Sequence, residues 1–177
     1  NVTCNGANDG TITITLPTGG YGTYEYRLNT GTWQGSGSFS GLAPGFYSVQ
    51  IRDAAHPACF IVLNAALEIT QPDVLSATVN SSNVTCNGAN DGTITITAPT
   101  GGYGTYEYRL DAGIWQSSGS FTGLAPGTYS VQIRDQAHPA CTQVIGSVLI
   151  TEPPVLNASV TAINHVACAG NSSGSVT

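Results

Sequence analysis

The sequence predicts an all-β protein made of tandem antiparallel β-sandwiches, and three observations support this prediction. First, the chain repeats itself: Cys4, Cys86 and Cys168 lie 82 residues apart, and so do Cys59 and Cys141. Second, apolar and polar residues alternate with a period of two, which indicates strands rather than helices. Third, turn segments that contain Gly and Pro separate the alternating segments at short intervals. A fixed period of this length is typical of an array of one structural unit.

The two copies of the repeat are almost identical. Residues 1–59 and 83–141 align without a gap and differ at eight positions, 16, 29, 30, 32, 35, 40, 46 and 54. We expect residues 1–72 to form a first repeat whose first strand is missing from the sequence, and residues 73–153 to form a second repeat. Residues 154–177 would hold the first strand and start of a third repeat, or a donated strand. Because domain boundaries usually fall in linkers and this sequence begins and ends within a repeat, we expect a window on a longer array.

The strands can be placed in order along the first repeat. In Thr11–Thr15 the isoleucines Ile12 and Ile14 share one face and the threonines share the other, as in a half-buried strand. Turn segments follow at 17–23, 29–32 and 41–45. The further predicted strands are Tyr24–Leu28, Trp33–Phe39, Tyr47–Arg52, Phe60–Ile69 and Val74–Val84. Six or seven short strands in each repeat predict tandem Ig-like or fibronectin-III-like antiparallel β-sandwiches with Greek-key connections.

One turn resembles a known feature of such sandwiches. The stretch GLAPGFY, residues 41–47, is similar to the connection before strand F, where a tyrosine hydroxyl donates a hydrogen bond to the upstream backbone. Tyr47 and Tyr129 are therefore the predicted corner tyrosines. The alternative is that they are ordinary core tyrosines.

The five cysteines favour disulfides over zinc, because the chain has no CxxC motif and no Cys/His cluster. The simplest solution is one pair in each repeat, Cys4 with Cys59 and Cys86 with Cys141, which leaves Cys168 with a partner outside the sequence. Each pair would close a loop of about 56 residues and contribute on the order of 4 kcal/mol. Reduced, buried thiols are the alternative.

Composition points to a secreted protein. Hydrophobic residues make up 41% of the chain and charged residues only 8%. The net charge of −6 disfavours nucleic acid and anionic membranes as partners. No apolar run reaches the roughly 18 to 20 residues that a membrane-spanning helix needs. The chain has no lysine and cannot form Lys–Asn cross-links, so we expect strength to come from disulfides, strand hydrogen bonds and contacts between repeats.

The sequence offers little for catalysis or for cofactor binding. His56, His138 and His165 have no nucleophile or acid at a suggestive spacing, so we expect no enzymatic activity. Asn8 and Asp9 carry oxygen atoms that suit calcium, but no EF-hand spacing surrounds them. We expect a structural turn at this point, and no metal or cofactor.

The aromatic residues permit one alternative function. Trp33, Trp115, Tyr21 and Tyr103 could form a sugar-stacking surface on each repeat, as in an array of carbohydrate-binding modules. The favoured expectation is that both tryptophans pack in the sandwich core.

An ordered set of motifs resembles a known family. The segments CNGANDGTITIT, GGYGTYEY and GLAPGFYSVQIRD, followed by a cysteine six residues later and by ITQP, are similar to the SprB-type repeat of cell-surface adhesins in Bacteroidota. The resemblance implies an extracellular, multi-repeat surface protein that is exported by the type IX route and serves adhesion, gliding or fibre formation. The turn AHPAC, residues 55–59, departs from the shorter glycine-containing turn expected there.

The resemblance leaves other functions and two modes of assembly open. Besides the carbohydrate-binding array, the chain could supply spacer domains of a large secreted enzyme. The expected partners are neighbouring repeats or subunits of the same fibre, and surface glycans if the aromatic residues bind sugars. We favour a continuous chain of repeats over exchange of a donated strand between separate subunits.

Overall fold

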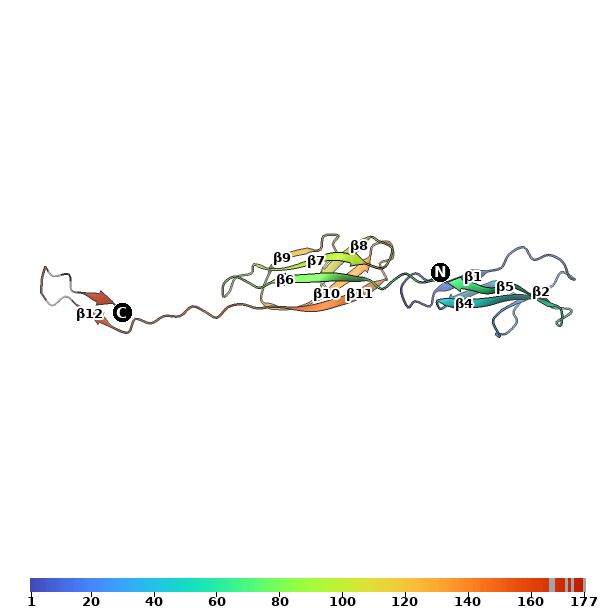
Figure 1. The fold of residues 1–177 in the computed structure, drawn as a ribbon, viewed down its shortest axis with the longest axis horizontal. Coiled ribbons are helices and arrows are strands. Elements are labelled where there is room, and N and C mark those ends of the chain that lie inside the picture. Colours follow the sequence, from blue (N-terminus) through green and yellow to red (C-terminus); the bar gives the residue numbers. More distant parts are fainter. Residues whose placement is uncertain (166–167, 171, 173, 177) are drawn as a thin grey trace.

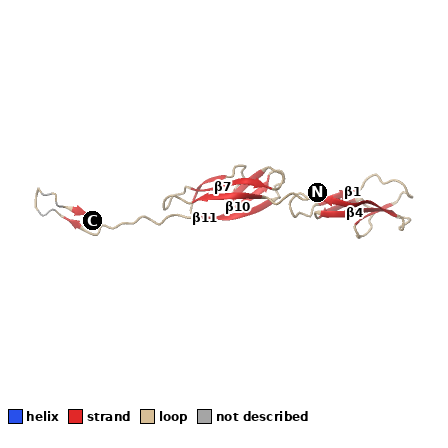
Figure 2. Cartoon of the chain, viewed as in Figure 1, coloured by secondary structure: helices blue, strands red, loops and turns tan. Residues whose placement is uncertain are grey.

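The computed structural model describes residues 1–165, 168–170, 172 and 174–176. These residues form strands, turns and loops and no helix, which confirms the predicted all-β fold (Figure 2). Val166, where the third copy of the repeat was expected to begin, lies outside the described residues.

The second repeat is a sandwich of two three-stranded antiparallel sheets. One sheet has the order β6-β7-β9 and the other β8-β10-β11. Between them Ile94, Val131 and Ile133 are completely excluded from solvent, because the inward residues of both sheets meet there. The strands are β6 (Ser76–Ser82), β7 (Gly92–Thr100), β8 (Tyr106–Leu110), β9 (Ser120–Leu124), β10 (Gly127–Asp135) and β11 (Thr142–Ile150).

The first repeat has the same order of strands but lacks a counterpart of β6. Its sheets are β1-β3 and β2-β4-β5. The strands are β1 (Gly10–Thr13), β2 (Tyr24–Leu28), β3 (Ser38–Leu42), β4 (Gly45–Asp53) and β5 (Phe60–Ile69). β1 has four residues whereas its counterpart β7 has nine, because β7 pairs along its length with β6 and β1 has only β3 as a partner. The core of the first repeat is correspondingly smaller and centres on Val2, Ile12, Val49 and Ile69.

Most of the predicted strands appear, and one is wrong. The predicted strands Tyr24–Leu28 and Phe60–Ile69 have the observed bounds. The predicted strand Trp33–Phe39 is instead a loop that bridges to β2 only at Gln34, and β3 begins at Ser38. The loop contains Gly35 and Gly37, which weaken a regular strand.

The tyrosines near the start of β4 and of its counterpart β10 bond to the backbone of the connection upstream. The Tyr47 hydroxyl donates to the carbonyl oxygen of Ala43 at 2.9 Å, and the Tyr129 hydroxyl donates to that of Ala125 at 3.0 Å. Both rings also pack against the cores of their repeats. The two sequence interpretations, corner tyrosine and core tyrosine, thus describe one arrangement.

The tail after β11 repeats the beginning of the second sandwich. β12 (Ile163–Asn164) pairs with β13 (Ser175–Val176), and Ile163 lies opposite Val176. This is the register of Ser81 opposite Ile94 in the β6–β7 pair, shifted by the repeat length.

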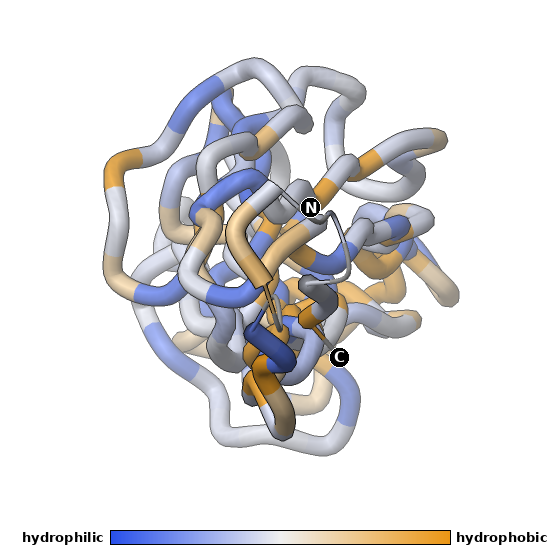
Figure 3. The backbone as a smooth tube through the Cα atoms, turned by 90° about the vertical axis from the view of Figure 1, so that its left-hand side faces the viewer, coloured by the Kyte–Doolittle hydropathy of each residue, from blue (hydrophilic) through white to orange (hydrophobic). Residues whose placement is uncertain are grey.

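The two repeats lie end to end along the longest axis of the molecule (Figure 1). Viewed along that axis, the parts of the chain overlap, and both termini lie within the outline of the molecule (Figure 3). The N-terminus lies at the end of the first repeat that faces the second, and Val2 there donates its amide hydrogen to Thr70 just beyond β5. The turn between β4 and β5, which carries Cys59, lies at the opposite end of the first repeat.

Candidate functional site at the junction between the repeats

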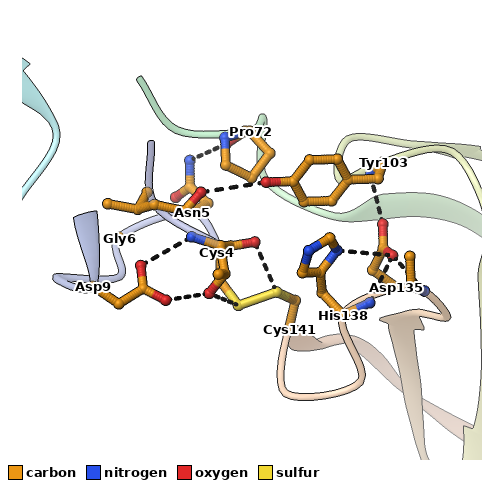
Figure 4. Close-up of a disulfide and its surroundings, with 12 residues drawn as sticks. Cys4, Asn5, Gly6, Asp9, Pro72, Tyr103, Asp135, His138 and Cys141 are labelled. Carbon is orange, nitrogen blue, oxygen red and sulfur yellow. Dashed lines mark hydrogen bonds and ion pairs between the residues drawn. A yellow bond between two sulfur atoms is a disulfide. The ribbon is translucent and has the colours of Figure 1, made fainter. Parts of the chain in front are cut away.

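A disulfide joins the two repeats. Cys4, in the loop before β1, is bonded to Cys141, in the turn before β11, across a sequence separation of 137 residues (Figure 4). Their Cα atoms lie 5.3 Å apart, within the range that disulfides span. Cys4 also packs against the core of the second repeat. The bond therefore fixes the end of one sandwich to the end of the next.

This pairing corrects the prediction of one disulfide within each repeat. Cys59 and Cys86, the predicted partners of Cys4 and Cys141, are free and exposed, and so is Cys168. The physical reason is strand direction: the Cys4 loop and the Cys59 turn lie at opposite ends of β4. Eight residue steps along β4 span about 26 Å, far more than the roughly 7 Å that two bridged Cα atoms can span.

Hydrogen bonds surround the disulfide on both sides. The Tyr103 hydroxyl of the second repeat donates to the carbonyl oxygen of Val2 in the first, at 3.3 Å. Asn5 donates from Nδ2 to the carbonyl oxygen of Pro72 at 2.9 Å, and the Gly6 amide donates to Oε1 of Gln71 at 2.8 Å. The bonds of Asn5 and Gly6 hold the Cys4 loop against the linker that enters the second repeat, and the bond of Tyr103 joins the two repeats directly.

The linker is clamped by two glycines of the second repeat. A Cβ atom on Gly101, whose φ is +80°, would lie 2.1 Å from the carbonyl oxygen of Val74, so only glycine fits there. The Gly102 amide donates to the carbonyl oxygen of Asp73 at 3.0 Å. Leu75, the next linker residue, is only 7% exposed and belongs to the core of the second repeat. The linker is therefore part of the sandwich and not a free hinge.

A buried aspartate shapes the end of the second repeat that meets the first. Asp135 is fully buried, and its carboxylate accepts hydrogen bonds from the amides of Tyr103 at 2.5 Å and Ala137 at 2.9 Å. The Tyr103 ring stacks on His138 with centroids 4.2 Å apart. These contacts join the loop before β8 to the turn that carries Cys141 (Figure 4).

The first repeat carries the same arrangement at its far end. Asp53 accepts a hydrogen bond from the Tyr21 amide at 2.6 Å, and the Tyr21 ring stacks on His56 at 4.2 Å. The bond from the Tyr21 amide is the main reason that the pKa of Asp53 lies below its ordinary value. This end therefore has the contacts of the junction end of the second repeat, although none of the described residues of the second repeat lies against it.

The loop that was considered for calcium is closed by hydrogen bonds of its own. The Asp9 carboxylate accepts bonds from the hydroxyl and the amide of Thr3, and Asp91 accepts the same two bonds from Thr85. The bond from the threonine hydroxyl, followed by that from the amide, lowers the pKa of each aspartate. Within the described part of the chain, no three His, Cys, Asp or Glu side chains gather as metal ligands.

The four aromatic residues considered for sugar stacking fall into separate clusters. Trp33 packs against Arg27 and Arg52, each with its guanidinium carbon 4.5 Å from the ring centroid. Trp115 packs in the same way, against the corresponding arginines of its repeat. Both tryptophans are half-buried and lie outside the core clusters, which differs from the favoured expectation. Tyr21 and Tyr103 stack on histidines instead.

Sequence reasoning missed several residues of the junction. The sequence pattern places Leu75 only in a strand, offers Tyr103 only as a possible sugar-stacking residue, and indicates no role for Asp135. The Asp that ends β10 directly before the turn QAHPAC was an available signal, because a carboxylate there can bond to the amides of the turn that follows.

Comparison with known families agrees with the sequence resemblance. The family model of the SprB repeat matches residues 1–32 and 78–113. The matched segments include Cys4 and Cys86 and end before Cys59 and Cys141. The searches of curated proteins and of solved structures each found no match. None of the described residues belongs to a helix of the length and apolarity needed to cross a membrane.

Proposed function

We propose that these SprB repeats form a non-enzymatic structural segment of a long adhesin or fibre on the surface of a bacterium of the Bacteroidota. The observation that carries the proposal is the disulfide between Cys4 of one repeat and Cys141 of the next. Such a bond constrains how one repeat sits on its neighbour and leaves the folding of each sandwich to its own core. Disulfides persist in oxidising environments, which supports an extracellular location.

The fold supports the same role. The sheets β6-β7-β9 and β8-β10-β11 correspond to the A-B-E and C-F-G pairings of Ig-like domains, which favours an Ig-like assignment of residues 73–153. Residues 1–72 form the same module without its first strand, and residues 154–177 begin a third. In such an array each module contacts mainly its neighbours, so length is gained by repetition.

The carbohydrate-binding alternative is not adopted, because both indoles already pack against guanidinium groups. A glycan array probed with the chain and with a variant carrying Trp33→Ala and Trp115→Ala checks this choice. Glycan binding that disappears in the variant would favour the alternative.

Antibodies against the purified chain test the location and the fibre. Applied to intact cells that produce the protein, they should label filaments or a surface layer, and brief protease treatment of intact cells should remove the label. Labelling that requires permeabilised cells would overturn the proposal.

A further inference from the structure

We propose that a second copy of this chain docks on the first through the contacts of the inter-repeat junction, with a disulfide between Cys86 of one copy and Cys59 of the other. Two surfaces carry this inference. The Cys86 face consists of residues 85–88 with residues 152–156, and the Cys59 face consists of residues 19–21 with residues 54–59. The inference rests on the proposed extracellular role, because the bond needs an oxidising environment.

The Cys86 face already has the internal bonds of the junction. Asn87 donates from Nδ2 to the carbonyl oxygen of Pro153 at 3.1 Å, and the Gly88 amide donates to Oε2 of Glu152 at 2.9 Å. Asn5 and Gly6 make the equivalent bonds to the linker beside Cys4. The loop around Cys86 thus makes the same internal hydrogen bonds as the Cys4 loop, and none of the described turns of the chain is bonded to it as the Cys141 turn is to Cys4.

The Cys86 face exposes a leucine whose counterpart is buried at the junction. Leu156 is 99% exposed, whereas its counterpart Leu75 is 7% exposed. A solvent-accessible cavity of about 460 Å³ lies between the Cys86 loop and residues 153–156. The corresponding cavity beside Cys4, where the Cys141 turn is seated, measures about 70 Å³.

The Cys59 face is the unoccupied counterpart of the surface that clamps the linker. A Cβ atom on Gly19 would meet nothing within 4 Å, whereas one on the equivalent Gly101 would collide with the linker. Tyr21 is 76% exposed, whereas Tyr103 is 50% exposed. The difference agrees with the hydrogen bond that the Tyr103 hydroxyl donates to the carbonyl oxygen of Val2. Docking would bring the Tyr21 hydroxyl to the carbonyl oxygen of Val84 in the other copy.

A cavity on the Cys59 face fits the exposed leucine. It measures about 160 Å³, and its lining includes Gly20, Ile51, Cys59 and Ile61. In the second repeat the equivalent of Gly20 is Gly102, and a Cβ atom built on it would lie 2.7 Å from Cδ2 of Leu75. Leu156 of one copy would therefore fill this cavity in the other.

Residues 157–161 can pair with β1 of the other copy, whose only strand partner among the described residues is β3. Leu156, Ala158 and Val160 have the spacing of Leu75, Ala77 and Val79, whose side chains pack into the core of the second repeat. In the register of the β6–β7 pair, where Val79 faces Ile96, Val160 would lie opposite Ile14 of the other copy. Residues 157–161 would pair beside β1, and the β12–β13 pair lies beyond them.

Formation of the bond is an oxidation. The thiols of Cys86 and Cys59 together lose two protons and two electrons as the sulfur–sulfur bond forms. A small-molecule disulfide such as oxidised glutathione accepts them and is reduced to two thiols.

Two variants in a Cys168→Ser background test the direction of docking. The first carries Cys59→Ser and the second Cys86→Ser, so each retains one half of the proposed bond, and both keep Cys4 and Cys141. In a glutathione redox buffer each variant alone should stay monomeric on a non-reducing gel. The equimolar mixture should form a dimer that contains a Cys86–Cys59 peptide and is lost on reduction.

A further variant separates docking from random oxidation. Leu156→Asp in the Cys59→Ser variant should slow dimer formation with its partner, and because Leu156 is exposed the fold should be unaffected. Dimers in either variant alone, or an unchanged rate with Leu156→Asp, would overturn the inference. So would a mixture that stays monomeric while peptide mapping shows Cys4 bonded to Cys141. A monomeric mixture together with positive surface labelling would refute the docking and leave the proposed function intact.

Discussion

The disulfide across the junction predicts how far the chain can be stretched. When force is applied between the two ends of the chain, the Cys4–Cys141 bond transmits the force, and the residues between Cys4 and Cys141 are not stretched. Only the 3 residue steps before Cys4 and the 36 after Cys141 remain outside the closed loop. At about 3.5 Å per residue, the oxidised chain should reach a contour length of about 140 Å.

Breaking the bond should release the enclosed chain. Replacing Cys141 by Ser opens the loop and adds 137 residue steps, so the contour length should rise by about 480 Å to about 620 Å. Single-molecule pulling with handles at the two ends measures both values. Thiol titration of the unreduced monomer, separated by gel filtration from any dimers linked through Cys86 and Cys59, should find the three free cysteines Cys59, Cys86 and Cys168 and so checks that the Cys4–Cys141 bond is intact.

The matched control is Cys59→Ser, which removes a free cysteine from the equivalent turn of the first repeat and should leave the short limit unchanged. The reasoning would be refuted by an oxidised chain that extends to about 620 Å. It would also be refuted by a Cys141→Ser variant that keeps the short limit.

Three further predictions concern stability and use urea denaturation followed by Trp115 fluorescence in a Trp33→Phe background. Leu75→Ala should lower the free energy of unfolding of the second repeat by about 2 to 5 kcal/mol, because it empties a buried site. Leu156→Ala, at the equivalent but exposed position, should change it by less than about 0.5 kcal/mol, and equal losses would contradict the burial of the linker. Tyr129→Phe should cost about 1 kcal/mol through the lost bond to Ala125, and an unchanged midpoint would show that this bond does not stabilise the repeat. Because the pKa values of Asp9, Asp53 and Asp91 are lowered by folding, their contribution to stability is present above the ordinary carboxyl pKa of 3.8 and is lost as the pH falls through the folded values. The urea midpoint, measured at a series of pH values from pH 5 downward, should fall as this contribution is lost. Asp91→Asn should make that fall shallower, and a variant whose midpoint falls as steeply as the parent's would show that Asp91 does not contribute.

The sandwich itself could be predicted because its signals are local. Ile12 and Ile94 alternate with threonines, and the turns before β2 and β8 contain glycines that adopt positive φ. The turn sequence before β4 predicts that the Tyr47 hydroxyl bonds to the upstream backbone, and it does so at Ala43. Each of these features depends on neighbours within a few residues, and the sequence contains those neighbours.

The partner of Cys4 could not be obtained from spacing alone, because the 82-residue period relates equivalent cysteines and does not say which ends of two sandwiches meet. Strand order carried part of the answer. In an antiparallel sandwich the loop before the second strand and the turn between the last two strands lie at opposite ends, which separates Cys4 from Cys59. The choice of Cys141 depends on how the linker around Leu75 enters the second core.

The placement of Trp33 was missed for a similar reason. Its neighbours Arg27 and Arg52 lie on different strands, and they share the outer face only because β2 and β4 pair in the register that sets Arg52 opposite Glu25. A loop residue that packs across two strands is invisible to a pattern read along one strand. The salt bridge between Arg52 and Glu25, at 2.7 Å, fixes one of the two guanidinium groups beneath the indole.

The closed loop between Cys4 and Cys141 also changes what a protease can do to the molecule. A single cut at any peptide bond inside this loop leaves both fragments attached through sulfur, so the chain stays in one piece. Only a cut outside the loop, before Cys4 or after Cys141, detaches material. A surface protein built in this way would stay intact after single cleavages in the turns between Cys4 and Cys141. It would release fragments only after cleavage outside that closed loop.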